Sequence, residues 1–160
     1  MTEHNDKNAA SSKGSKEFLT ARVGDQTFGI PVLQVQDVLG EQRVTRVPLA
    51  RAEIAGSLNL RGRVVTAINL RRKLDLPDRP KGEKSMYIVV EHKGELYSLI
   101  VDTVGEVLSL PDSDFENTPP TLDPAWRALA LGIYRLKALL LVIIDVPVML
   151  ESLFTKEDAA

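Results

Sequence analysis

Apolar residues recur along this chain in short runs that alternate with polar residues, a pattern typical of β-strands. Residues 17–32 alternate in this way on both sides of Gly24, and residues 85–101 do so on both sides of Gly94. A glycine between two alternating runs favours a tight hairpin turn. The pattern therefore predicts two β-hairpins, 17–32 and 85–101.

A similar phrase follows each predicted hairpin. Residues 35–39 read VQDVL, and residues 104–108 read VGEVL. Similar units at a fixed offset indicate an internal repeat. We therefore predict a duplication of β units, although the shared phrase is too short to establish common descent.

The remaining apolar runs predict a mainly β fold. Further strands are expected at 44–47, 58–60, 63–70, 130–134 and 139–144, with a closing helix at 148–154. About ten short strands suit two packed five-stranded barrels, because closure removes exposed sheet edges. A polar stretch with two prolines, 75–84, predicts the approximate junction between two barrel subdomains.

The ends of the chain and its longest apolar run argue against secretion and membrane insertion. Residues 1–16 are polar and predict a disordered N-terminal tail, and residues 155–160 predict a C-terminal tail. The apolar run 138–148 is half the length of a membrane span and contains Asp145, which favours a buried strand. We therefore expect a cytoplasmic protein.

The composition argues against metal, cofactor, nucleic-acid and catalytic functions. The chain has no cysteine, two histidines, a net charge of -2 and 5% aromatic residues. A basic surface with stacking aromatics is typical of nucleic-acid binders. His92 is predicted to be a solvent-exposed turn residue, and the acidic cluster 112–116 a solvated charge run, which leaves an acid-pair hydrolase as a minor alternative. We expect no catalytic residue, metal or cofactor.

The most informative segment, residues 54–72, reads IAGSLNLRGRVVTAINLRR. With it, the chain resembles the CheW-like chemotaxis coupling proteins from about residue 17 to residue 154. The matching positions are Phe18, Gly24, Gly29, Ile30, VQDV at 35–38, Ile54, Gly56, NLRG at 59–62, Ile68, Leu70, Arg71, VDTV at 101–104 and Val107. NLRG alone is a weak signal, but its place between the two predicted hairpins makes the combination specific.

This resemblance implies a non-enzymatic adaptor built of two SH3-like five-stranded β-barrels. Members of the family act in chemotaxis signal transduction, within a two-component system. They bind the regulatory domain of the histidine kinase CheA and the cytoplasmic tip of methyl-accepting receptors. The implied location is the cytoplasm, at membrane receptor arrays reached through these partners. At 160 residues, a stand-alone coupler is expected.

The resemblance also implies the binding residues. Receptor contacts are expected from Asn59, Arg61, Gly62, Gly56, Val35, Val104 and Val107, and kinase or receptor contacts from Asp37 and Val38. From the residues alone, a solvated turn arginine is the favoured interpretation of Arg61, and core positions are favoured for the valines. Gly62 is predicted to satisfy the turn, and Asn59 to order it by bonding to the backbone.

Three positions depart from the usual family pattern, because Asp37 replaces Glu, Thr66 replaces Pro and Asn69 replaces Asp. An ion pair from position 69 is therefore not expected, which should leave the fold intact because surface pairs contribute about 0–1 kcal/mol. The alternative function is a small β-barrel that binds nucleic acid or another ligand such as an oligosaccharide, a class in which similar barrels are common. Mild acidity and scarce aromatics argue against it.

Overall fold

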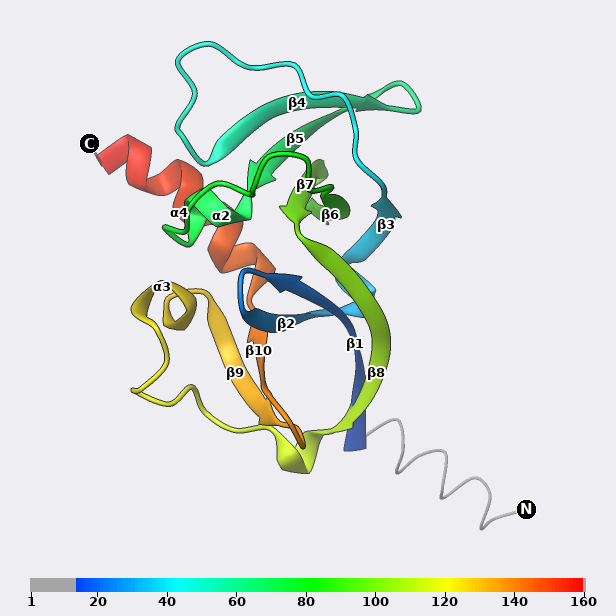
Figure 1. Cartoon of the computed structure of the whole chain (residues 1–160), viewed down its shortest axis with the longest axis vertical. Helices are drawn as coiled ribbons and strands as arrows, with labels where there is room; N and C mark the ends of the chain where they lie inside the picture. Colours follow the sequence, from blue (N-terminus) through cyan, green and yellow to red (C-terminus); the bar gives the residue numbers. More distant parts are fainter. Residues whose placement is uncertain (1–13, 160) are drawn as a thin grey trace.

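The computed structural model describes residues 14–159, and side chains as far as residue 153. Within this range the chain forms ten strands in two five-stranded sheets (Figure 1). Sheet A has the order β8 (Thr103–Pro111), β1 (Ser15–Val23), β2 (Gln26–Pro31), β10 (Leu140–Ile144) and β9 (Ala130–Arg135). Sheet B has the order β3 (Val35–Leu39), β6 (Met86–His92), β7 (Glu95–Val101), β5 (Arg63–Asn69) and β4 (Ile54–Leu60).

The prediction of a mainly β chain with two five-stranded units is confirmed. Most of the predicted N-terminal tail lies outside the described residues, and β1 begins at Ser15, inside the segment expected to be tail. Residues 44–47 contribute only an isolated bridge from Thr45 to Ser57 instead of a full strand. Helix α4 (Val146–Ala159) extends beyond the predicted 148–154 at both ends.

The predicted junction at 75–84 is wrong. This segment joins α2 (Leu70–Lys73) to β6 and so connects two parts of sheet B. The chain passes between the sheets after β2, through the 3₁₀ turn η1 (Val32–Gln34), and again after β7. Polar, proline-containing sequence marks a surface loop in either case, so its composition could not distinguish a loop within one unit from a boundary between two.

The predicted duplication is present in the topology. Strands β1–β5 and β6–β10 follow the same plan, with an antiparallel hairpin, a third strand that joins the other sheet, and a second antiparallel pair. The last strand of each half runs parallel to the second hairpin strand of its own sheet, β10 beside β2 and β5 beside β7. Each sheet is therefore completed by strands from both halves of the chain.

The repeat extends to two buried glycines, Gly56 in β4 and Gly132 in β9. Each follows a register shift in its strand pair, and each lies where the preceding loop crosses the strand. A Cβ on Gly56 would overlap the carbonyl oxygen of Thr45, and a Cβ on Gly132 would overlap the ring of Phe115. These close backbone approaches require glycine in both halves.

The helix that follows each half begins with an equivalent polar residue. The side chain of Asn69 accepts hydrogen bonds from the backbone N–H groups of Arg71 and Arg72 at the start of α2. Asp145 Oδ1 accepts from the N–H of Val148 at 3.1 Å at the start of α4. Side-chain oxygens at this position satisfy N–H groups that have no partner within the helix. Asn69 therefore retains a capping function.

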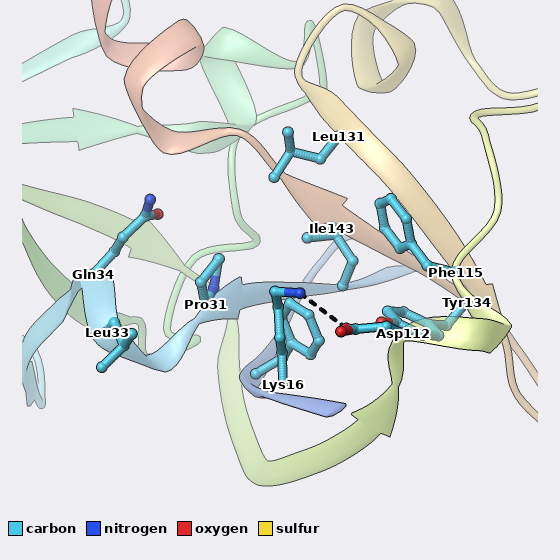
Figure 2. A pocket seen from close by; sticks show the side chains of 10 residues that line it. Lys16, Pro31, Leu33, Gln34, Asp112, Phe115, Leu131, Tyr134 and Ile143 are labelled. Carbon is cyan, nitrogen blue, oxygen red and sulfur yellow. Dashed lines mark hydrogen bonds and ion pairs between the residues drawn. The ribbon is translucent and has the colours of Figure 1, made fainter. Parts of the chain in front are cut away.

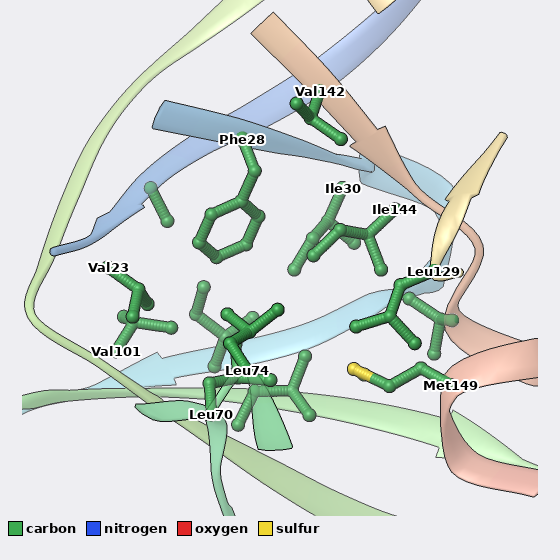
Figure 3. Packing of buried hydrophobic residues seen from close by; sticks show 14 of the residues in the cluster. Val23, Phe28, Ile30, Leu70, Leu74, Val101, Leu129, Val142, Ile144 and Met149 are labelled. Atoms are coloured by element: carbon green, nitrogen blue, oxygen red, sulfur yellow. The ribbon is translucent and has the colours of Figure 1, made fainter. Parts of the chain in front are cut away.

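The largest apolar cluster lies between the sheets and joins them into one unit (Figure 3). Phe28 and Ile30 of sheet A pack in this cluster with Leu70, Val101 and Met149. Trp126, on the short helix α3 (Pro124–Arg127), stacks at a tilt against Phe28 with ring centroids 5.6 Å apart. Smaller clusters cover the opposite faces of sheet A and sheet B. Because the main core draws on both sheets, we expect them to unfold together.

Candidate functional site

The turn between β4 and β5 has a backbone conformation that its sequence specifies. Arg61 and Gly62, the two central residues, have φ angles of 52° and 85°. Positive φ at both central positions defines a type I′ turn, which matches the twist of a β-hairpin. Asn59 Oδ1 accepts a hydrogen bond from the Gly62 N–H at 2.9 Å, as predicted. The turn is therefore fixed from within, and the Arg61 side chain projects from it into solvent.

Asp37 on β3 lies opposite this turn. Arg61 Nη2 donates to Asp37 Oδ2 at 3.0 Å, with side-chain exposures of 76% and 27%. Strands β3 and β4 are the two edges of sheet B, so the ion pair joins one edge to the turn at the other. An exposed pair of this kind contributes about 0–1 kcal/mol to stability. Its main consequence is to hold a cation and a carboxylate together on the surface.

A small pocket of about 180 Å³ lies beside this pair. Leu60, Val89 and Leu96 supply its apolar part, and Arg61 and Asp37 are at its edge. The surface therefore combines an apolar depression with groups that can bind carboxylates, carbonyls or amides.

The other predicted contact residues are divided between the sheets. Val35 and Val38 lie on β3, whereas Val104 and Val107 lie on β8 in sheet A. Val35, Val38 and Val104 are partly buried against the central core, and Val107 is 48% exposed. The four valines thus occupy equivalent positions on the two strands that follow the crossovers. Gly56 is buried, and its close approach to Thr45 is a structural reason for glycine there.

Asp102, at the crossover from β7 to β8, is the centre of an ion-pair cluster that the sequence did not indicate. Arg71 donates to both carboxylate oxygens, at 3.0 and 2.6 Å. Arg79 Nη2 donates at 3.0 Å and the Gly24 N–H at 2.8 Å. Burial raises the pKa of Asp102, but the hydrogen bonds from Arg71, Gly24 and Arg79 outweigh it and hold the pKa below its usual range. This cluster ties the β1–β2 turn to α2 and the following loop.

Two predictions about polar residues are changed by long-range contacts. The side chain of His92 is only 16% exposed, because α4 lies against the β6–β7 turn and Glu151 Oε2 contacts His92 Nε2 at 3.0 Å. In the acidic cluster, Asp112 pairs with Lys16 at 2.9 Å and Glu116 with Arg135 at 3.0 Å. These carboxylates therefore serve surface ion pairs between elements.

Two sheets that share one core and hold a fixed, charged turn at a sheet edge fit the class of small β scaffolds that present a surface to other proteins. The comparison with known families agrees with this class. The model described as CheW-like domain matches residues 17–154, so the chain belongs to the CheW-like family of chemotaxis scaffolding and adaptor proteins.

Individual relatives and one solved structure are similar over most of the chain. The chemotaxis protein CheW of Rhizobium meliloti strain 1021 is 28% identical, covering 92% of this chain and 92% of the relative. The chemotaxis protein CheW of Klebsiella aerogenes is 30% identical over 91% of this chain and 85% of the relative. The crystal structure of the scaffolding protein TtCheW from Thermoanaerobacter tengcongensis has a TM-score of 0.76 and 28% identity, covering 85% of this chain and 92% of that chain.

Among the described residues, no helix combines the length and the apolar composition needed to cross a bilayer.

Proposed function

We propose that this chain couples methyl-accepting chemotaxis receptors to a CheA-type histidine kinase, and that it does so in the cytoplasm without catalysing a reaction. The support is the match to the CheW-like family over residues 17–154 together with the fixed turn that presents Arg61. An adaptor must offer two protein surfaces on one rigid frame. The shared core between sheets A and B supplies that frame.

The receptor surface is proposed to centre on Arg61. Its side chain is 76% exposed, and the guanidinium carries five N–H donors, of which Asp37 engages one nitrogen. The remaining donors are free to bind carboxylates or the carbonyls at a helix end. Asn59 and Gly62 hold the turn, and Gly56 lets the loop at Thr45 pack on the strand that leads to it.

The apolar part of the receptor surface is proposed to be the pair of crossover strands. Val35 on β3 and Val104 and Val107 on β8 would contact the apolar face of a helical receptor tip, which is how grooves commonly bind helices. Asp37 and Val38 lie on β3, the edge strand of sheet B, where a kinase or receptor contact would be made.

The experiment is a pull-down from the lysate of a chemotactic bacterium, with the full chain as bait and blotting for the receptor and the kinase. We expect recovery of both, and Arg61→Ala to reduce receptor recovery about tenfold, because charge-assisted hydrogen bonds contribute about 1.5–3 kcal/mol. Arg135→Ala is the matched control, because Arg135 also makes an exposed 3.0 Å ion pair but lies in sheet A.

Two results would contradict the proposal. Recovery of neither protein by the unaltered bait would remove the coupling function. Equal receptor recovery by the Arg61 and Arg135 variants would remove Arg61 from the receptor surface while leaving the adaptor function in place.

A further inference from the structure

Sheet A contains a pocket of about 540 Å³ that no part of the proposed adaptor function uses (Figure 2). The apolar cluster on this face of sheet A has four buried members, whereas the corresponding cluster of sheet B has seven. Fewer side chains therefore fill this face of sheet A. The volume lies within the range of roughly 300–1,000 Å³ typical of small-molecule sites.

Aromatic and aliphatic side chains form most of the wall. Phe18 and Phe115 both pack at a tilt against Tyr134, with ring centroids 5.6 and 5.3 Å from it. Leu131 and Ile143 complete this side, as Figure 2 shows. Tilted ring pairs accommodate another flat ring in an edge-to-face or offset arrangement, so the wall favours an aromatic ligand.

The polar groups of the pocket define what such a ligand must supply. At the rim, Lys16 Nζ donates to Asp112 Oδ1 at 2.9 Å, so these two charges satisfy each other. Gln34 lies across the pocket from Phe115 (Figure 2), and its buried Oε1 accepts no hydrogen bond from the residues that the structure describes. A buried acceptor without a donor is costly, so the complementary group is an N–H donor.

We propose that this pocket binds a small planar aromatic molecule that carries one N–H donor. The ring lies among Phe18, Phe115 and Tyr134, and the N–H donates to Gln34 Oε1. The site is separate from the turn at Arg61, and the proposal is independent of the adaptor function.

The test is a titration of the ¹⁵N-labelled full chain with indole, followed by amide chemical shifts. Benzofuran is the matched ligand, because it has the same size and an ether oxygen in place of the N–H. We expect saturable shifts at residues 32–34 and 131–134, and benzofuran to bind about tenfold more weakly, since it leaves the acceptor unpaired. Gln34→Leu should make the two ligands bind equally.

A pair of variants tests the location. Leu131→Asp places a carboxylate in the apolar wall and should abolish indole binding. Leu139→Asp adds the same charge outside the pocket, at a site of similar exposure, 42% against 50% for Leu131, and should bind indole like the unaltered chain. The proposal is wrong if indole causes no saturable shift, if benzofuran binds as tightly to the unaltered chain, or if Leu131→Asp binds indole normally.

Discussion

The two halves of this chain share one topology but differ at the crossovers and in the conformation of their hairpin turns. The phrases at 35–39 and 104–108 align Leu33 with Asp102, since each lies two residues before the phrase. Asp102 is held by two arginines and a backbone N–H, whereas Leu33 is 95% exposed. The crossover from β7 to β8 is therefore held by ion pairs. Among the described residues, no comparable ion pair holds the crossover from β2 to β3.

The turns after β4 and β9 differ in a similar way. Register aligns Gly56 with Gly132, and hence Arg61 with Lys137 and Gly62 with Ala138. Arg61 and Gly62 have positive φ angles, but Lys137 and Ala138 do not. Features kept in both halves, such as the glycines and the helix caps, serve the fold. Features present in one half are the candidates for function or for local stability.

The largest effect is expected from the paired glycines. Gly56→Ala and Gly132→Ala should each destabilise the chain by about 3 kcal/mol, because the new Cβ meets the crossing loop and the backbone or ring must move. Gly62→Ala, whose Cβ would meet no atom within 4 Å, should cost about 1 kcal/mol from its positive φ alone. Urea unfolding measures all three. The losses of unfolding free energy in Gly56→Ala and Gly132→Ala should be similar. If they differ by more than the loss in Gly62→Ala, the two glycines do not have the same structural role in the two halves.

A smaller effect is expected at the crossovers. Asp102→Ala should cost about 2 kcal/mol, because it leaves Arg71 and Arg79, with side-chain exposures of 12% and 16%, without their carboxylate. Leu33→Ala, at the equivalent position, should change stability by less than about 0.5 kcal/mol, because the side chain is exposed. If Asp102→Ala and Leu33→Ala lower the stability equally in thermal or urea unfolding, the ion pairs at Asp102 do not distinguish the two crossovers.

The pH dependence sharpens the same comparison. The folded-state pKa of Asp102 is lowered, so its contribution is present above the unfolded value of about 3.9 and is lost as the pH falls through the folded pKa. The stability difference between the unaltered chain and Asp102→Ala should therefore be largest near neutral pH and shrink toward pH 3. A difference that is constant between pH 7 and pH 3 would contradict the assignment of Asp102 as a charged partner.

Local pattern predicted the strands, and contacts distant in sequence decided the rest. Alternation on both sides of Gly24 and Gly94 predicted the hairpins, and Asn59 to Gly62 specified its own turn, because these interactions span a few residues. The exchange of strands between halves, by contrast, depends on pairings such as β1 with β8. The composition of residues 75–84 contains no information about these long-range strand pairings.

The proposed binding surface was only partly predictable for the same reason. Arg61 was identified through the resemblance, but its ion pair with Asp37 joins residues 24 positions apart at opposite edges of a sheet. Asp102 belonged to the matching VDTV phrase, yet its arginine partners lie 23 and 31 residues away. Sequence spacing alone could not show that Arg71 and Arg79 both donate to the carboxylate of Asp102.

The turn that carries Arg61 differs in conformation from the equivalent turn at Lys137 and Ala138, and we propose that it makes the receptor contact. The most direct measurement is the affinity of the purified chain for a receptor cytoplasmic tip, compared between Arg61→Ala and Lys137→Ala. These variants remove one exposed cation from equivalent turns of sheet B and sheet A. We predict about tenfold weaker binding for Arg61→Ala and unchanged binding for Lys137→Ala, with both chains folded as judged by circular dichroism. Equal affinities for the two variants would contradict the claim.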